Sequence, residues 1–155
     1  MINKSLFSSN TSLWSTPQDF FDAVNDEFHF DIDVCALPEN AKCNRYFTPE
    51  DDGLSQDWGC YTSVWCNPPY GKDSVKWISK AYTTSRLCGT TIVMLLPART
   101  DTKAFHEYIY NKSEIRFIKG RLKFGGGVNS APFPSMLVIF RGKNYHINKE
   151  KNGIL

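Results

Sequence analysis

The apolar residues of this chain fall into short runs that predict the strands of one sheet. Ser63 to Cys66 and Thr90 to Leu96 are apolar runs of strand length, which is typical of buried strands. Phe30 to Val34 alternates apolar and acidic residues, as a strand with one exposed face does. Glu114 to Ile118 and Met136 to Phe140 predict two further strands near the end of the chain.

Helical spacing fills the segments between these runs. We expect a helix over residues 17–28, because Thr16 can cap its first turn and Pro17 suits the first helical position. Residues 74–87 predict a second helix, and a shorter third one follows the run that ends at Leu96. The expected inward-facing residues are Phe20, Phe21, Val24 and Phe28, then Val75, Ile78, Ala81 and Tyr82, then Phe105, Tyr108 and Ile109. Trp77 would cover an edge of the second helix, and Thr100 or Asp101 would cap the third.

Strands that alternate with helices predict an α/β doubly wound sheet in a single domain, here residues 13–141. Residues 1–12 are polar and rich in Ser and Asn, so we expect a flexible N-terminus. Residues 142–155 are polar and basic and predict a loose tail. Residues 121–134 contain Gly125-Gly126-Gly127, which lacks the lysine and serine of a phosphate-binding loop. We interpret this segment as a mobile flap.

The composition narrows the class of protein. A hydrophobic fraction of 41% supplies a proper core, and no apolar run approaches the ~20 residues that a membrane helix needs. Five cysteines without a C-x-x-C pair, and three scattered histidines, argue against a zinc site and a disulfide framework. We therefore expect reduced thiols in a cytoplasmic protein that needs no metal and no membrane.

The net charge of +2 hides an asymmetry along the chain. Residues 1–60 hold eleven acids and three bases, whereas residues 61–155 hold five acids and fifteen bases. A basic half of this kind favours a polyanionic partner. An ordinary solvated surface with lysine-rich loops explains the same charges equally well, so charge alone leaves both interpretations open.

The candidate chemistry is concentrated at Asn67-Pro68-Pro69-Tyr70. Prolines lack the N–H that a sheet ladder needs, so Asn67 is expected at the carboxyl end of a strand. Ligands of open α/β sheets bind at that edge. The Asn67 carbonyl accepts hydrogen bonds and Tyr70 offers an aromatic face, so together they could hold a planar group that carries an NH₂. A tight turn with an aromatic plug is the alternative interpretation.

The tetrapeptide resembles the catalytic motif of S-adenosylmethionine-dependent amino methyltransferases. Further segments narrow the resemblance to the phage-type Dam family of DNA N6-adenine methyltransferases, over about residues 13–141. In chain order they are Trp14-Ser15-Thr16-Pro17, Phe30 to Ala36, Tyr46-Phe47-Thr48, Asp52-Gly53-Leu54 and Gly120 to Phe124. The resemblance implies a Rossmann-like methyltransferase fold, with a mostly parallel sheet and an antiparallel hairpin at its C-terminal end.

The resemblance also implies an activity. The chain would transfer a methyl group from S-adenosylmethionine to the N6 amino group of adenine in double-stranded DNA. The setting would be phage or restriction-modification biology in the host cytoplasm. The catalytic residues would be Asn67, Pro68, Pro69 and Tyr70. The expected cofactor-binding residues are Trp14, Thr16, Pro17, Asp33, Cys35, Ala36, Phe47 and Asp52. The expected DNA-binding residues are Arg99, Lys103, Arg121, Lys123 and Phe124. The chain has no room for a separate recognition domain, so specificity would lie in loops or in a homodimer.

Several alternatives stay open at the level of sequence. The carboxylates of Asp31, Asp33 and Glu50-Asp51-Asp52 could hold magnesium in a nuclease that uses Lys72. A methyltransferase of RNA or of a protein glutamine would share the tetrapeptide, as would a non-catalytic DNA-binding protein that kept the fold. Asp33 could be an exposed acid at a strand end. Phe124 could pack in the core instead of stacking on a base.

Overall fold

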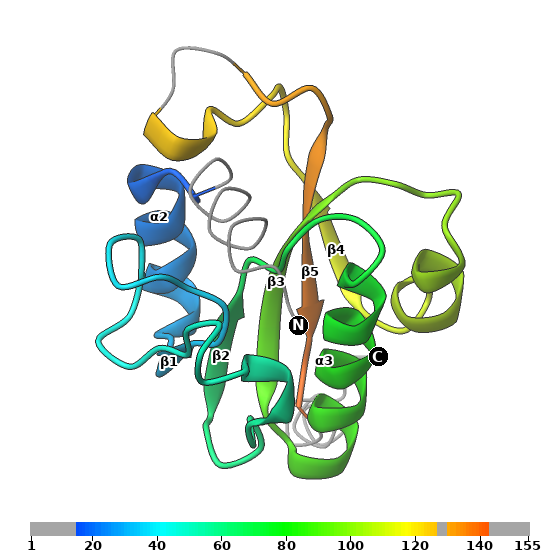
Figure 1. Ribbon diagram of the computed structural model, residues 1–155. Coiled ribbons are helices and arrows are strands. Elements are labelled where there is room, and N and C mark those ends of the chain that lie inside the picture. The colour runs from blue at the N-terminus through cyan, green and yellow to red at the C-terminus, as the bar shows by residue number, and fades with distance from the viewer. Residues whose placement is uncertain (1–14, 127–129, 143–155) are drawn as a thin grey trace.

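The chain forms one five-stranded sheet in the order β1-β2-β3-β5-β4, with helices on both faces (Figure 1). The strands are β1 (Ile32–Asp33), β2 (Ser63–Cys66), β3 (Thr91–Pro97), β4 (Glu114–Phe117) and β5 (Ser135–Phe140). The computed structural model describes residues 15–126 and 130–142, so Trp14 and both predicted loose termini, apart from the first tail residue, lie outside it. Within the described residues no helix is both long and apolar enough to cross a membrane. All predicted strands are present, although β1 is shorter than expected.

The strand directions bring four carboxyl ends to one edge of the sheet. β1 pairs with β2, and β2 with β3, in parallel. β5 pairs antiparallel with both β3 and β4. The predicted antiparallel pair at the C-terminal end is therefore confirmed. Because β4 opposes β5, it runs in the same direction as β1, β2 and β3. We call the edge where these four strands end the carboxyl edge.

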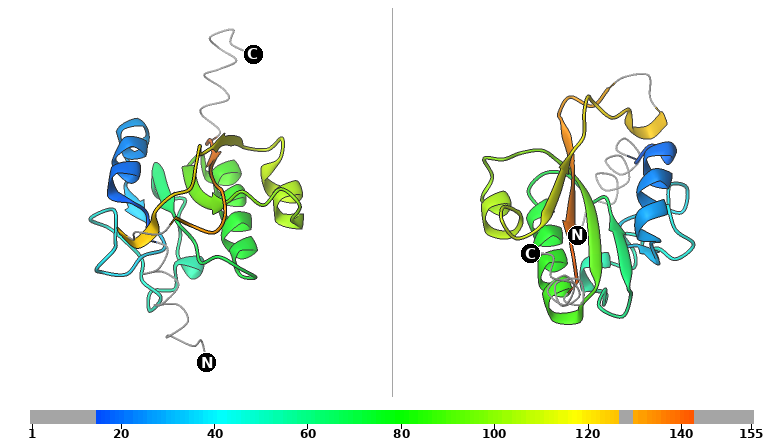
Figure 2. Two further views of the ribbon diagram at one scale, coloured as in Figure 1. Left: turned by 90° about the horizontal axis from the view of Figure 1, so that it is seen from above. Right: turned by 180° about the vertical axis from the view of Figure 1, so that it is seen from behind.

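Alternate strand residues face two separate hydrophobic layers. On β3, Met94 belongs to the layer formed with α3 (Ser74–Cys88) and the short helix η2 (Phe105–Ile109). The next residue back, Val93, faces the opposite layer, which contains the apolar stripe of α2 (Gln18–Phe28). Figure 2 shows α2 and α3 on opposite sides of the sheet. A segment that leaves the sheet at its carboxyl edge can therefore pack against the α2 face or against the α3 face.

The helix starts differ from the predictions in their capping residues. Pro17 occupies the N-cap position of α2, and no side chain caps that helix, so Thr16 does not have the predicted role. The first turn of the third helix is capped by Thr102, whose hydroxyl accepts the N–H of Phe105 at 3.2 Å. The predicted caps lay one and two residues earlier. Capping geometry depends on where the chain leaves the preceding strand, which local sequence does not define.

The buried face of α3 is also rotated from the prediction. Trp77 is 4% exposed, whereas Val75, expected to face inward, is 39% exposed. Trp77 stacks on the buried ring of Trp58 with centroids 5.9 Å apart. Two large flat rings remove more apolar surface from water when they pack together than the valine would alone. The helix therefore buries the side that carries Trp77.

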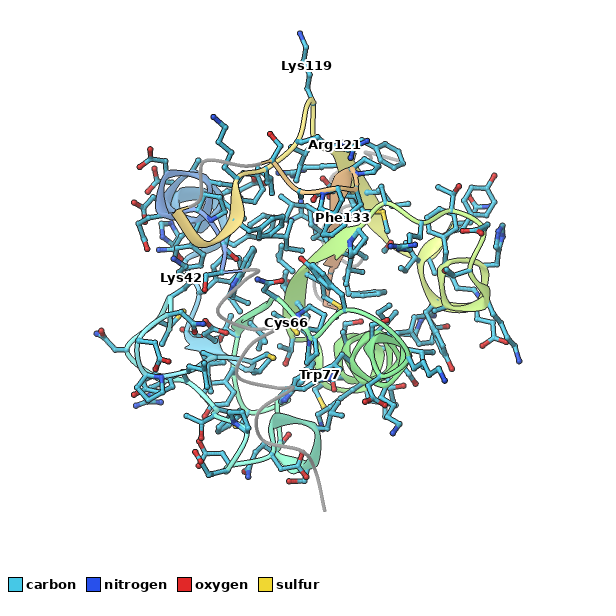
Figure 3. All side chains as sticks on the ribbon, turned by 45° about the horizontal axis from the view of Figure 1, so that its top comes forward. Lys42, Cys66, Trp77, Lys119, Arg121 and Phe133 are labelled. Atoms are coloured by element: carbon cyan, nitrogen blue, oxygen red, sulfur yellow. The ribbon has the colours of Figure 1, made fainter. Side chains whose placement is uncertain are left out.

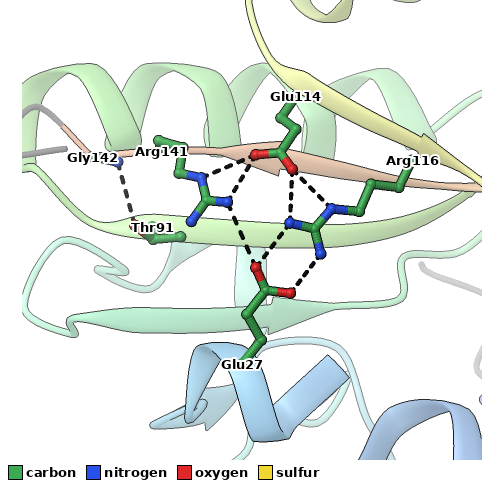
Figure 4. A network of polar contacts seen from close by, with 6 residues as sticks. All are labelled: Glu27, Thr91, Glu114, Arg116, Arg141 and Gly142. Atoms are coloured by element: carbon green, nitrogen blue, oxygen red, sulfur yellow. Dashed lines mark hydrogen bonds and ion pairs between the residues drawn. The ribbon is translucent and has the colours of Figure 1, made fainter. Parts of the chain in front are cut away.

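Four charged side chains tie α2 to the edge of the sheet (Figure 4). Arg116 on β4 donates to both carboxylate oxygens of Glu27 on α2, at 2.5 and 2.8 Å, and to Glu114 at 2.8 Å. Arg141 donates to Glu114 at 2.8 Å and lies 3.8 Å from Glu27. Both guanidinium groups also lie over the ring of Phe28. α2 is thus held by charge as well as by its apolar face.

Replacing Glu114 with glutamine tests this network. Burial opposes ionisation of Glu114, but hydrogen bonds from Arg141 and Arg116 outweigh it and keep its pKa below 4.5. Since folding lowers this pKa, the stabilisation is present above pH 4.5 and is lost as the pH falls through the lower folded value. We expect Glu114→Gln to reduce the free energy of unfolding by about 1 kcal/mol at neutral pH. Denaturant unfolding should show a difference that shrinks as the pH is lowered below 4.5; a difference that stays constant over that range would contradict the network.

Candidate active site

Asn67 follows directly after β2, at the carboxyl edge. Its Oδ1 accepts a hydrogen bond from the Tyr70 hydroxyl at 3.0 Å. Its Nδ2 donates to Oγ1 of Thr16 at 3.2 Å. Thr16 comes from the segment before α2, far away in sequence, and is 4% exposed. The Asn67 amide is therefore held from two sides.

The backbone at this position has little freedom of its own. Pro68 restricts the preceding Asn67 to extended conformations, and β2 fixes the chain before it. Pro68 is buried, and Asn67 is half-buried. The remaining freedom lies in the side-chain torsions of Asn67, which the two hydrogen bonds limit. A polar group fixed in this way needs little reorganisation when a partner arrives.

Three aromatic rings form a wall beside the motif. Tyr70 meets Phe133 edge-to-face, with ring centroids 5.4 Å apart, and Phe124 at 6.3 Å. Phe124 begins the turn η3 (Phe124–Gly126) and is 5% exposed, packed in the layer on the α2 face. Burial raises the pKa of Tyr70 above its ordinary value, so the phenol stays protonated and can donate to Asn67. The sequence-based picture of Phe124 as an exposed ring is wrong, because the flap folds onto α2.

A pocket of about 210 Å³ lies on the α3 side of the sheet, past the end of β1. Four of the residues expected to bind the cofactor line it: Cys35, Ala36, Phe47 and Asp52. The other lining residues are Val34, Thr48, Pro49, Gly53, Leu54, Asp73, Lys76 and Trp77. In Figure 3, Trp77 and Phe133 lie on opposite sides of Cys66, the last residue of β2. The pocket and the aromatic wall thus flank the strand that leads into the motif.

Two features of the pocket wall bear on ligand binding. The indole Nε1 of Trp77 is buried and has no hydrogen-bond partner in the described part of the chain. An unused buried donor is unfavourable unless a ligand or water satisfies it. Gly53, in the turn η1 (Gly53–Ser55), has no room for a side chain, since a Cβ would lie 2.3 Å from the Val34 carbonyl oxygen. Asp52 beside it adopts a left-handed conformation with φ 53°, which aspartate tolerates better than most residues.

Asp33 lies beneath the loop that follows β1 and does not line this pocket. It is 3% exposed, so the interpretation as an exposed acid is wrong. Its carboxylate accepts the backbone N–H groups of Cys35 at 3.2 Å and Lys42 at 3.0 Å. Burial raises its pKa to about 7, against the lowering effect of these two hydrogen bonds. Asp33 therefore shapes the loop that carries Cys35 and Ala36 into the pocket wall.

Thr16 and Pro17 line a second, shallower hollow together with Lys42 and Gly125. The preceding residue, Ser15, is hydrogen-bonded to the flap and to the loop after β1. Its carbonyl accepts the N–H of Gly125 at 2.9 Å, and its hydroxyl accepts from the side chain of Asn40 at 3.2 Å. The segment ahead of α2 is therefore anchored between the flap and the loop after β1. This position puts it beside Asn67 as well.

The basic residues expected to bind DNA divide between two places. Arg121 and Lys123 are exposed in the flap, and Arg99 is exposed just beyond β3 at the same carboxyl edge. Arg121 also donates to the carbonyl of Ala131 at 3.3 Å, across the flap. Lys103 lies two residues before η2, which packs with α3. The first three thus follow strands that end at the carboxyl edge, and Lys103 lies further along the connection after β3.

The magnesium hypothesis finds no support among residues 15–126 and 130–142, where no three His, Cys, Asp or Glu side chains are grouped to hold a metal ion. Asp31 accepts two backbone N–H groups at the start of β2, at 2.9 and 3.0 Å. Asp51 accepts the N–H of Thr48 at 2.8 Å. Asp31 therefore ties the residue before β1 to the start of β2, and Asp51 stabilises a local turn. All five cysteines are free thiols.

Comparison with known proteins decides among the remaining alternatives. The family model described as DNA N-6-adenine-methyltransferase (Dam) matches residues 4–152. The chain belongs to the Dam family. It is 35% identical over 144 residues to the DNA N-6-adenine-methyltransferase of Haemophilus phage HP1, covering 87% of this chain and 82% of that protein. It is 33% identical over 111 residues to the DNA N-6-adenine-methyltransferase of Escherichia phage T1, covering 71% of this chain but 46% of that longer protein.

Membership in the Dam family agrees with the resemblance found in the sequence. It makes adenine in DNA the methyl acceptor, rather than RNA or a protein glutamine, and it implies a methyl donor of the S-adenosylmethionine type. The family match does not assign roles to individual residues. The roles proposed for individual residues rest on the contacts of Asn67, the pocket and the flap.

Sequence reasoning missed two residues that lie at the candidate site. Trp77 was expected at a helix edge, although a tryptophan in the first turn of α3 is costly to leave in water. Phe133 received no role, yet it lies between Pro132 and Pro134, where a rigid backbone presents its ring to Tyr70. The local sequence shows that each ring needs a packing partner, but it does not indicate which residue that partner is.

Replacing Phe124 with alanine separates packing from base stacking. Because the ring is buried in the layer on the α2 face, we expect Phe124→Ala to lower the free energy of unfolding by ~3–5 kcal/mol. The matched control is Phe117→Ala on β4, whose ring is 66% exposed and should contribute little. Denaturant unfolding measures both. A Phe124→Ala protein with unchanged stability and lost DNA methylation would instead assign the ring to the base.

Proposed function

We propose that this Dam-family chain transfers a methyl group from S-adenosylmethionine to N6 of adenine in double-stranded DNA. The observation that carries the proposal is the Asn67 amide, fixed at the carboxyl edge between Thr16 and Tyr70. The sheet supports it, since three parallel strands followed by an antiparallel pair suit a shortened Rossmann-like methyltransferase fold. In open α/β sheets that edge is where ligands bind.

The pocket past β1 is the proposed site for the adenosine part of the cofactor. When bound, S-adenosylmethionine supplies the methyl group from a sulfonium centre. Phe47 can pack against the plane of an aromatic ring, and the Asp52 carboxylate can accept from an amino group. The unused N–H of Trp77 can donate to a ring nitrogen or a hydroxyl. Cys35 and Ala36 are small enough to let the ligand approach the end of β1 closely.

Asn67 Oδ1 and the Pro68 carbonyl are the proposed acceptors for the two hydrogens of the target amino group. Adenine N6 is a weak nucleophile because its lone pair is delocalised into the ring. Acceptors that draw both hydrogens to one side favour the tetrahedral geometry in which this lone pair can attack. Tyr70 would stack on the base while Pro69 keeps the turn rigid, so catalysis is mainly proximity and orientation.

The target adenine is paired inside the duplex and must be flipped out to reach Asn67. Arg121, Lys123 and Arg99 are exposed around the carboxyl edge and can neutralise phosphates there. Lys103 would reach DNA where the duplex passes over the η2 side. Phe124 supports the aromatic wall behind Tyr70 and so holds the stacking ring in place.

Replacing Asn67 with alanine tests the acceptor role. We expect turnover to fall at least ~10²-fold, the scale on which one positioned polar group acts, while the melting temperature changes little. Asn44→Ala, an exposed asparagine in the loop after β1, is the control and should keep its turnover. A labelled-methyl assay with DNA, RNA and protein acceptors gives the readout. Near-normal methylation by a folded Asn67→Ala protein would remove this mechanism.

Replacing Asp33 tests how the cofactor loop is held. Asp33→Ala leaves two backbone N–H groups without their acceptor, so we expect S-adenosylmethionine binding to weaken by ~1–3 kcal/mol. Asp31→Ala is the matched control, because Asp31 also accepts two backbone N–H groups, but these belong to the start of β2 and not to the loop that lines the pocket. It should lose stability and keep cofactor affinity. Calorimetry that shows equal cofactor affinity for both variants would separate Asp33 from cofactor binding.

Single charge deletions test the proposed DNA face. We expect Arg121→Ala and Lys123→Ala each to flatten the salt dependence of DNA binding by about one phosphate contact. Arg86→Ala removes the same charge from the last turn of α3, at the opposite end of the sheet, and should keep the wild-type slope. Binding titrations over a range of salt concentrations provide the slopes. Wild-type slopes for both flap variants would place the DNA elsewhere.

A further inference from the structure

Thr16 gives up the role that its position in sequence favours. A threonine before a helix usually caps it, which is worth about 1 kcal/mol. In this chain no side chain caps α2, and the buried Thr16 hydroxyl instead accepts a hydrogen bond from Asn67 Nδ2 at 3.2 Å. The hydroxyl is therefore directed toward the motif and away from its own helix.

We propose that Thr16 is a positioning residue for the methyl-transfer reaction, which keeps the Asn67 amide oriented for the target amino group. The inference rests on the proposed acceptor role of Asn67. It assigns Thr16 a function different from the cofactor contact that the family resemblance implies. In this positioning role Thr16 contacts neither the substrate nor the cofactor and acts only through Asn67.

The orientation matters because the two ends of an amide have opposite hydrogen-bonding character. An amide rotated by half a turn would present its NH₂ to the NH₂ of adenine, donor against donor. With Nδ2 held by Thr16, Oδ1 faces the Tyr70 side, where the base would stack. An amide oxygen can accept two hydrogen bonds, so the bond from Tyr70 does not exclude one from the base.

Thr16 is itself held firmly enough to act as a reference point. The adjacent Ser15 accepts the N–H of Gly125 in η3, at 2.9 Å, and the Asn40 side chain in the loop after β1, at 3.2 Å. Pro17 fixes the backbone on the other side, and its carbonyl accepts the first helical hydrogen bond of α2, from Phe21 at 3.0 Å. The orientation of Asn67 thus depends on a segment anchored at three places.

Three substitutions isolate the hydroxyl of Thr16. Thr16→Val keeps the shape and removes the acceptor, while Thr16→Ser and Thr16→Ala form a pair that differs only in the hydroxyl. We expect kcat to fall about tenfold in Thr16→Val and in Thr16→Ala and to stay near wild type in Thr16→Ser, the scale of one lost hydrogen bond in the transition state. Calorimetry should give an S-adenosylmethionine affinity within about twofold of wild type for all three.

A second readout does not depend on activity. The side-chain amide signals of Asn67 in a ¹⁵N–¹H spectrum can be identified by their absence from Asn67→Ala. We expect these signals to shift and exchange faster with solvent in Thr16→Ala than in Thr16→Ser. If Thr16→Val does not fold, as judged by its melting temperature, the serine and alanine pair carries the comparison alone.

The outcomes separate this inference from the proposed function. Equal loss of kcat in the serine and alanine variants, unchanged Asn67 signals, or lost cofactor affinity with kcat maintained would each overturn the positioning role. The last result would make Thr16 a cofactor residue. An active Asn67→Ala protein would overturn the proposed acceptor mechanism itself, whatever Thr16 does. An inactive Asn67→Ala with fully active Thr16 variants would overturn the positioning role alone.

Discussion

The candidate active site depends on one covalent constraint, the two prolines that follow Asn67. They cannot extend the sheet ladder, so β2 must stop at Cys66. The parallel pairing of β2 with its neighbours then determines what surrounds the stop: Asp33 lies opposite Trp65, and Cys66 opposite Met94. The loop after β1 and the loop after β3 consequently emerge on either side of Asn67. A slip of one residue in either register would move these loops and turn the alternating side chains to the wrong layer.

The same constraint explains why the site uses both faces of the sheet. Trp65 packs in the layer on the α2 face and Cys66 in the layer on the α3 face, so the chain leaves β2 between the two layers. Asn67 continues this alternation toward Thr16 and the aromatic wall. The pocket that contains Trp77 lies on the α3 side. A methyl donor bound on one side and a base bound on the other would meet at the end of β2. Beyond that point β2 makes no further ladder hydrogen bonds.

Sequence patterns predicted the elements of this fold well and their contacts poorly. The buried runs located β2, β3 and β5, because these apolar runs have the length of a strand and are too short for a typical buried helix. The family resemblance grouped Cys35, Phe47 and Asp52, which the structure brings to one pocket. Predictions from local sequence failed where a residue far away in the chain determined the contact.

Three residues illustrate this failure. Thr16 has the right identity and position for a helix cap, but the amide of Asn67, provided by tertiary structure, takes its hydroxyl. Trp77 is buried because Trp58 offers a flat partner. Phe124 looked exposed between two basic residues and a triple glycine, yet its ring packs into the layer on the α2 face, beside Tyr70 and Phe133. In each case packing or a long-range hydrogen bond outweighed local preference, which spans less than ~1 kcal/mol per residue.

In the structure, several of the charged residues that make up the charge asymmetry of the sequence form contacts within the fold. Several acids of the first half, Asp31, Asp33 and Asp51, accept backbone N–H groups and stabilise loops. In the second half, Arg116 and Arg141 pair with Glu27 and Glu114, so they serve the attachment of α2. The basic character available to DNA is therefore concentrated in the exposed Lys119, Arg121 and Lys123 and in Arg99. All four follow a strand that ends at the carboxyl edge. A phosphate backbone drawn to that edge would be held beside Asn67, so local charge and catalytic geometry select the same surface.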